Sequence, residues 1–232
     1  MNDPVRVVVL ASGGGSNFQS LLDRFREPSA PARVVGLVAS RETAGALHRA
    51  ERAGVPTAVI HARAPEDDAS LLLETFDQWS GDLVVLAGYM QLIPERVVES
   101  YVGRLINIHP ALLPAFGGQG MYGTRVHQAV LESGTRITGA TVHFVDEAYD
   151  RGPIIAQWPV PVRSDDVVDT LSARVLETEH VLLPAVVDAL ASGRVWLDPD
   201  RRVRWTDEWF EADRFHFGGS GRFGLPDEHD RT

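Results

Sequence analysis

Apolar runs alternate with helix-length amphipathic segments along the first half of the chain. The apolar runs predict buried strands at Val5–Ala11, Val34–Ala39, Thr57–Ile60, Leu83–Ala87 and Leu105–Ile108. The segments between them predict helices at about Asn17–Arg26, Ala44–Ala53, Glu66–Trp79 and Pro94–Tyr101. Pro94 suits the first turn of a helix, and Gly54 before Pro56 suits a helix end. This βαβ rhythm predicts an α/β fold with a Rossmann-like, open, mostly parallel sheet and helices on both faces.

The rhythm changes after Ile108, where a Gly- and Pro-rich loop covers His109–Gly123. The elements predicted beyond it are a helix near Thr124–Glu132, strands at about Ala140–Val145 and Ile154–Val162, and a helix at about Asp166–Ala191. Pro184 is expected to interrupt or kink this last helix. Long loops inside compact domains are uncommon and often carry function. Residues 1–195 are therefore expected to form a single domain, followed by an aromatic-rich C-terminal extension, 196–232, of unknown role.

The composition excludes several classes of chemistry. The 232 residues include 22 basic and 32 acidic ones, which gives a net charge of −10. Every basic residue is arginine and there is no cysteine. The chain therefore has no thiolate nucleophile, cysteine-based metal site, Schiff-base lysine or P-loop lysine. Dispersed basic residues on an acidic chain also argue against nucleic-acid binding.

Other absences narrow the partners and the location. The apolar runs are far shorter than the roughly 20 residues that cross a bilayer, and the N-terminus lacks the features of a signal peptide. His143 alternates with apolar neighbours on a predicted strand, so we expect a core or supporting residue. The other histidines show no metal-binding spacing, so no metal is expected. We expect a cytoplasmic protein, monomer or homodimer, that acts on small molecules without membrane or nucleic-acid partners.

A glycine-rich loop, Ser12–Asn17, follows the first strand and opens the first helix. Free backbone N–H groups and the helix dipole attract an anion at such a position. Phe18 stands where a dinucleotide fingerprint requires its third glycine, so a terminal phosphate fits better than NAD. The alternative is a tight turn in which Ser16 or Asn17 caps the helix.

Asn107 and His109 lie at the end of the fifth predicted strand, where ligands bind in open α/β sheets. Their spacing places both side chains on one face of the strand, with Ile108 on the other. An amide donor beside an imidazole suits a carbonyl whose oxygen becomes an oxyanion. Asp150 can orient or charge the histidine. Alternatively, His109 is hydrogen-bonded in the turn that Pro110 forces, and Asp150 caps its own turn.

Four segments in this order resemble the glycinamide ribonucleotide formyltransferases, folate-dependent enzymes of purine synthesis. They are Val9–Asn17, Val84–Met90, Asn107–Pro114, and Thr141–Val145 leading to Asp150–Pro153. Each segment alone is a weak signal, but four at matching spacing are specific. The resemblance covers roughly residues 5–195 and implies the formyltransferase fold, with residues 1–195 as the catalytic domain.

The resemblance implies transfer of the formyl group of 10-formyltetrahydrofolate, a cosubstrate, to the amine of 5-phosphoribosylglycinamide. No metal is implied. Asn107 and His109 would stabilise the tetrahedral oxyanion, and Asp150 would pair with His109 and assist proton transfer. The residues implied for ribotide binding are Gly15, Ser16, Asn17 and Glu179. For Glu179 the alternative is an exposed acid on a helix face.

The folate would lie against an apolar wall with a few polar groups, which suits a flat heterocycle. The residues implied for folate binding are Met90, Gln91, Leu92, Ile93 and Asn107. The loop Glu147–Gly152 would cradle the pterin. For the apolar members of the wall, the alternative is ordinary core packing after the fourth strand.

Two features depart from the family pattern. Family members often carry a basic residue where this chain has Gln91, and Arg63 is only a loose candidate for contacts to the glutamate tail of folate. The loop Ala115–Gly123 is longer than usual, so its contacts do not transfer.

Several alternative functions share parts of this pattern. They are formyltetrahydrofolate deformylase, methionyl-tRNA formyltransferase, a sugar-nucleotide formyltransferase, and a non-catalytic folate- or nucleotide-binding module. Detection of formylated ribotide, free formate or neither product would discriminate among these classes.

Overall fold

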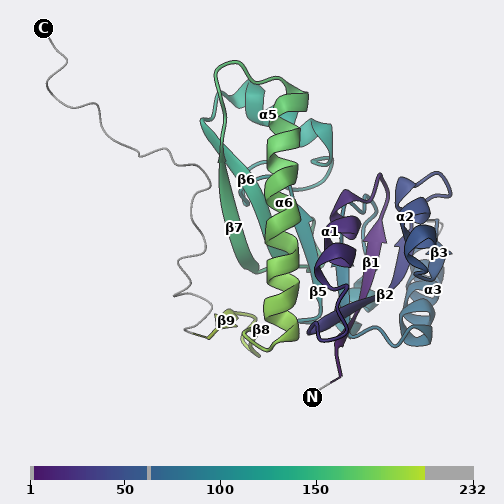
Figure 1. Ribbon diagram of the computed structural model, residues 1–232. Helices are drawn as coiled ribbons and strands as arrows, with labels where there is room; N and C mark the ends of the chain where they lie inside the picture. Colours follow the sequence, from purple (N-terminus) through teal and green to yellow (C-terminus); the bar gives the residue numbers. More distant parts are fainter. Residues whose placement is uncertain (1–2, 62–63, 207–232) are drawn as a thin grey trace, which may run out of the picture.

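The computed structural model describes residues 3–61 and 64–206 (Figure 1). Within these ranges, seven strands form one sheet with the order β3-β2-β1-β4-β5-β6-β7. The strands β1 to β5 run parallel, and β6 and β7 are antiparallel additions at one edge. The strands are β1 (Val5–Ala11), β2 (Ala32–Ala39), β3 (Thr57–Val59), β4 (Leu83–Leu86), β5 (Leu105–His109), β6 (Ile137–Phe144) and β7 (Ile154–Pro161). The prediction of an open, mostly parallel sheet is confirmed.

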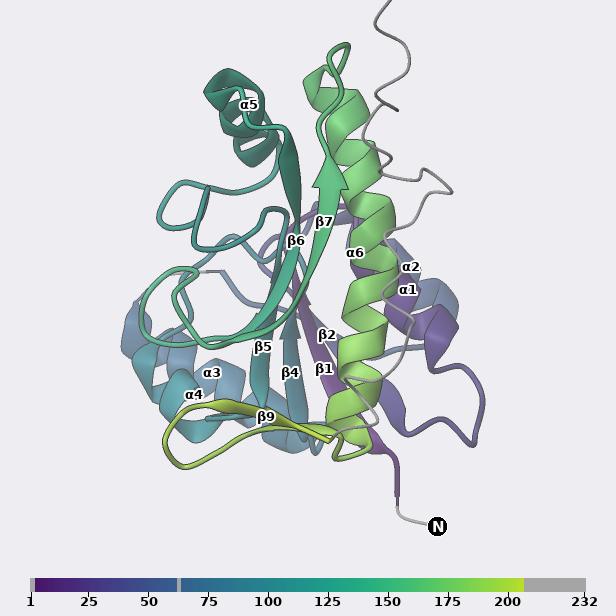
Figure 2. The same ribbon diagram turned by 90° about the vertical axis from the view of Figure 1, so that its left-hand side faces the viewer.

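Helices cover both faces of this sheet (Figure 2). They are α1 (Ser16–Arg24), α2 (Gly45–Ala53), α3 (Pro65–Gln78), α4 (Glu95–Ser100), α5 (Thr124–Ser133) and α6 (Val168–Ala191). One hydrophobic core lies between the sheet and α1, α2 and α6, and a second lies between the sheet and α3 and α4. The spacing of apolar residues along the sequence predicted each of these helices. It did so because each helix buries its apolar face on one of the two cores. Pro94 stands at the cap position of α4 rather than inside its first turn.

The helix α6 runs without interruption through Pro184 (Figure 1). The expectation that this proline interrupts the helix is wrong. Proline removes one backbone hydrogen bond, but Leu182, Leu183, Val186 and Val187 around it are fully buried in the core. The packing of this apolar face outweighs the local cost and keeps the helix continuous.

A short hairpin of β8 (Val195–Leu197) and β9 (Val203–Trp205) follows α6 and was not predicted. Strands this short give little periodic signal. Leu197 and Val203 pack against the first core. The hairpin spans the predicted boundary at 195/196, which stays a prediction, and the aromatic residues from Trp209 onward lie outside the described residues. No helix in the described ranges is long and apolar enough to cross a membrane.

The parallel strands bring distant segments together at the carboxyl edge of the sheet. The glycine-rich loop follows β1, residues 87–93 follow β4, and His109 ends β5. The antiparallel pairing of β5 with β6 places Asn107 opposite His143. This edge is where open α/β sheets bind ligands.

Candidate active site at the carboxyl edge of the sheet

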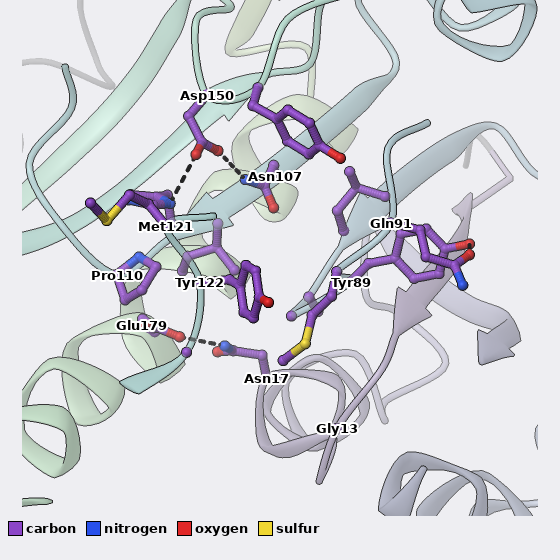
Figure 3. A pocket seen from close by; sticks show the side chains of 18 of the residues that line it. Gly13, Asn17, Tyr89, Gln91, Asn107, Pro110, Met121, Tyr122, Asp150 and Glu179 are labelled. Carbon is purple, nitrogen blue, oxygen red and sulfur yellow. Dashed lines mark hydrogen bonds and ion pairs between the residues drawn. The ribbon is translucent and has the colours of Figure 1, made fainter. Parts of the chain in front are cut away.

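A cavity of about 780 Å³ lies at this edge. It is lined by the segments after β1, β4 and β5, by the loop before α5, by the loop after β6, and by one face of α6. Figure 3 shows that side chains from these separate elements surround one space. All site residues proposed from the sequence line this cavity, namely Gly15, Ser16, Asn17, Met90, Gln91, Leu92, Ile93, Asn107, His109, Asp150 and Glu179.

Asp150 lies at the centre of a buried polar cluster. Its Oδ2 is 3.5 Å from Nδ1 of His109 and accepts a 2.9 Å hydrogen bond from the Gly118 N–H. Its Oδ1 accepts a 3.3 Å hydrogen bond from Nδ2 of Asn107, which Figure 3 shows as a dashed line. Asp150 has a left-handed backbone with φ of 56°, a conformation that aspartate tolerates better than most residues. The alternative in which Asp150 serves only its own turn is wrong.

His109 is almost fully buried and has two polar contacts. Its Nε2 lies 2.8 Å from the carbonyl oxygen of Phe116, so this nitrogen carries a proton and donates it to the carbonyl. The other ring nitrogen, Nδ1, faces Asp150. Burial lowers the pKa of His109, and the Asp150 charge only partly opposes this effect.

The carboxyl of Asp150 responds to the same surroundings in the opposite sense. Burial raises its pKa, but His143, His109 and the Gly118 N–H together outweigh burial and hold the pKa below its usual range. The surroundings therefore favour the ionised form of Asp150 and disfavour the charged form of His109. The two groups titrate as a coupled pair.

His143 supports Asn107 from the neighbouring strand. Its Nδ1 donates a 2.8 Å hydrogen bond to the carbonyl oxygen of Phe144, and its Nε2 lies 3.1 Å from Nδ2 of Asn107 and 3.7 Å from Oδ1 of Asp150. Both N–H bonds of the Asn107 amide are thus directed at protein groups, His143 and Asp150. The contact to Asp150 is the longer of the two, so it is the one that can give way to a substrate oxygen.

The glycine-rich loop leads into α1 without a side-chain cap. Gly15 occupies the cap position with φ of 73°, and the helix begins at Ser16. The alternative in which Ser16 or Asn17 caps the helix is therefore wrong. A Cβ atom on Gly15 would lie 2.7 Å from Cα of Ala46, so this position requires glycine for space as well as for conformation.

Asn17 and Glu179 meet across the cavity floor, although 162 positions separate them in the chain (Figure 3). Nδ2 of Asn17 donates a 2.5 Å hydrogen bond to Oε2 of Glu179. Glu179 is only 7% exposed, so the alternative of an exposed helix-face acid is wrong. Burial raises the pKa of Glu179 to about 7, while the Asn17 amide acts in the opposite direction.

The segment after β4 presents both core and surface residues. Met90 is 43% exposed and Leu92 is 52% exposed, so ordinary core packing does not account for either. Ile93 is buried in the second core and also borders the cavity. The amide oxygen of Gln91 accepts a 2.9 Å hydrogen bond from the Tyr89 hydroxyl, which fixes the side chain at the cavity mouth.

Some cavity residues were not found from the sequence. His127 of α5 is buried and lines the cavity, and burial, followed by the proximity of His109, lowers its pKa to about 4. Residues 118–123 of the long loop also line it. Neither carries a motif, and only the fold brings them to the site. Arg63 lies outside the described residues, within which no cluster of three acidic or histidine side chains could hold a metal ion.

Residues 5–187 match the family described as Formyl transferase. The chain belongs to this family. Among relatives, it is 42% identical to the chloroplastic phosphoribosylglycinamide formyltransferase of Vigna unguiculata, over 82% of this chain and 62% of the relative. It is 41% identical to the trifunctional purine biosynthetic protein adenosine-3 of Bos taurus, over 88% of this chain and 20% of the relative. The chain thus spans only part of these two formyl transferase relatives.

Solved structures of this family give the same result. Glycinamide ribonucleotide transformylase 1 from Symbiobacterium toebii superposes with a TM-score of 0.82 and 38% identity. The superposition covers 89% of this chain and 96% of that structure. The resemblance inferred from the four sequence segments is confirmed at the level of family and fold.

Proposed function

We propose that this formyl transferase moves the formyl group of 10-formyltetrahydrofolate to the amine of 5-phosphoribosylglycinamide, in purine biosynthesis. One observation carries the proposal. A single cavity joins the open N-terminus of α1, which suits a phosphate, to the cluster of Asn107, His109 and Asp150, which suits formyl transfer. A substrate with a phosphate at one end and an amine at the other can span these two sites.

The ribotide would bind along the floor of the cavity. Its phosphate would accept hydrogen bonds from the backbone N–H groups of Gly15, Ser16 and Asn17 at the positive end of the helix dipole. Glu179 would accept hydrogen bonds from the ribose hydroxyls. This placement is supported by the burial of Glu179 beside Asn17 and directs the amine toward His109.

The folate would bind against the segment after β4. Met90 and Leu92 expose apolar surface that a heterocycle can cover, and Gln91 offers an amide fixed by Tyr89. The carbonyl end of the formyl group would then reach Asn107. The loop after β6 also lines the cavity, through Tyr149 and Asp150.

The chemistry requires an oxyanion donor and a proton carrier. The amine nitrogen attacks the formyl carbon, a carbon–nitrogen bond forms, and the carbonyl electron pair moves to the oxygen. An N–H of Asn107 turns from Asp150 to this oxyanion, while the proton lost by the attacking nitrogen passes to the His109–Asp150 pair. The bond to N10 of the folate then breaks, and N10 takes up the proton.

The alternatives use less of the cavity. A deformylase transfers the formyl group to water and has no need of a phosphate site in the same cavity. A tRNA formyltransferase needs a basic surface, whereas the net charge here is −10. A cytoplasmic location and a monomeric or homodimeric state stay predictions.

The test is the deformylation of 10-formyltetrahydrofolate, or of its dideaza analogue, followed spectrophotometrically with and without 5-phosphoribosylglycinamide. We expect turnover only with the ribotide, and formylated ribotide as the product. Formate release without ribotide would replace the proposal with a deformylase. Folate binding without turnover would indicate a non-catalytic module.

A further inference from the structure

The cavity has an unusual charge distribution for a site that takes an anion. Among the described residues that line it, none is arginine, and the chain has no lysine. A phosphate at the start of α1 would therefore have no cation in direct contact within this part of the chain. Two arginines instead contact the glycine-rich loop from outside the cavity, Arg41 in the segment that joins β2 to α2 and Arg49 on α2 itself.

Donors from this joining segment and from α2 bind three successive carbonyl oxygens of the loop. Nε of Arg41 donates to the Ser12 carbonyl at 2.7 Å, the Ala46 N–H donates to the Gly13 carbonyl at 3.1 Å, and Nε of Arg49 donates to the Gly14 carbonyl at 2.8 Å. Neither arginine nor Ala46 lines the cavity. The loop carbonyls are thus held on the side away from the ligand space.

The next carbonyl, that of Gly15, accepts the Gln19 N–H inside α1. The side chain of Gln19 accepts a further hydrogen bond from Nη1 of Arg49 at 3.3 Å, so Arg49 binds both the loop and the helix. By contrast, no acceptor within the described ranges pairs with the amide N–H groups of residues 13–18. With the carbonyls bound on one side, these N–H groups remain available for a ligand.

We propose that Arg41 and Arg49 are positioning residues of the anion site. They hold the loop carbonyls away from the cavity, so that the N–H groups point into it, and they add positive charge behind the loop. This assignment rests on the proposed function for the identity of the anion, the phosphate of the ribotide. A loop carbonyl that turned inward would place partial negative charge against that phosphate.

The first test is steady-state kinetics of Arg41→Ala, Arg49→Ala and the double variant. Loss of one charge-assisted hydrogen bond to the loop should raise the KM for the ribotide by about tenfold, and the double variant should exceed either single one. The kcat and the KM for the folate should stay within about twofold. Arg52→Ala, an exposed arginine later in α2, is the control for net charge and should match the wild type.

A second pair of variants separates geometry from charge. Arg49→Lys keeps the charge and a donor and should recover part of the affinity, whereas Arg49→Gln keeps only a donor and should recover less. Added salt should raise the KM for the ribotide in the wild type, and this rise should be smaller in the double variant. Thermal unfolding of each variant checks that the affinity change is not loss of fold.

Binding of inorganic phosphate, measured by calorimetry, tests the same residues without any assumption about the reaction. Arg49→Ala should bind phosphate about tenfold more weakly than Arg52→Ala. Equal phosphate affinity and equal ribotide KM in these two variants would overturn the assignment. If Arg49→Ala weakens phosphate binding while the wild type formylates no ribotide, the positioning role stands and the proposed function fails.

Discussion

The two ends of the cavity differ in the groups that they offer to a ligand, although both lie at the same edge of one sheet. The glycine-loop end offers backbone N–H groups fixed by the fold, with the buried carboxyl of Glu179 beside Asn17. The opposite end offers side chains, and burial and mutual contact move the pKa values of His109 and Asp150. Backbone donors suit a phosphate whose charge stays constant during the reaction. Titratable side chains suit the atoms between which protons move.

Because of this difference, substitutions should be able to impair ribotide binding and the chemical step separately. A change at the loop should weaken affinity for the ribotide and leave the chemical step intact. A change at the cluster should slow the chemical step and leave affinity nearly unchanged.

The largest effect is expected for Asp150→Asn. Asparagine tolerates the left-handed backbone at this position, but it cannot hold the charge that pairs with His109. The kcat should fall about 1000-fold, while the KM for the ribotide changes less than about threefold. Asp67→Asn, the same change at an exposed position of α3 outside the cavity, is the control and should leave both constants unchanged. A rise in the ribotide KM of Asp150→Asn as large as its fall in kcat would contradict the separation of binding from chemistry.

A smaller effect, on affinity alone, is expected for Gly15→Ala. The added Cβ would be strained at φ of 73° and would lie 2.7 Å from Cα of Ala46, which displaces the loop. Ribotide KM should rise about 30-fold with kcat within about threefold, because the cluster is untouched. The matched control is Gly134→Ala, which has φ of 71° and open space around it. If Gly15→Ala and Gly134→Ala lose ribotide affinity equally, the cause is general destabilisation and not displacement of the loop.

The pH dependence of stability tests the burial of Glu179 at the glycine-loop end of the cavity. The pKa of Glu179 is raised to about 7 in the folded protein, from an ordinary value of 4.5. The folded state therefore holds this proton more tightly, so stability should fall as pH rises from about 4.5 to about 7, by up to about 3 kcal/mol. Denaturant unfolding should show a flatter profile for Glu179→Gln. The exposed Glu177→Gln should keep the wild-type profile, and an unchanged slope in Glu179→Gln would refute the assignment.

The smallest effect is expected at the folate wall. Leu92 is 52% exposed at the cavity, so Leu92→Ala should raise the KM for folate by about threefold and change stability by less than about 0.5 kcal/mol. Val102 is equally exposed but does not line the cavity, and Val102→Ala should leave both KM values unchanged. Equal folate KM in the two variants would remove Leu92 from the proposed wall.

The sequence predicted the elements of the fold because local periodicity determines them. The buried strands of the βαβ part are short apolar runs, and its helices carry an apolar stripe of helical period. The clustering of the glycine-rich loop with Asn107 and His109 was also predictable, since parallel strands end at the same edge. Pro184 shows the limit of this approach, because the burial of its neighbours overrides the local propensity.

The remaining site contacts depend on long-range register, which no local pattern specifies. His143 meets Asn107 only because β6 pairs with β5 in one of several possible registers. Glu179 meets Asn17 because α6 packs on α1. The arginines behind the loop reach its carbonyls only once α2 is seated beside it. These contacts required the structure.

The most direct test of the division between the two ends is calorimetric binding of 5-phosphoribosylglycinamide to Asp150→Asn. The ribotide should bind with a Kd within about threefold of the wild-type value although turnover is lost, because the backbone donors of the glycine loop and Glu179 are unchanged. A Kd weakened about 100-fold or more, in a variant that unfolds at the wild-type temperature, would show that the cluster supplies binding as well as chemistry and would contradict the account.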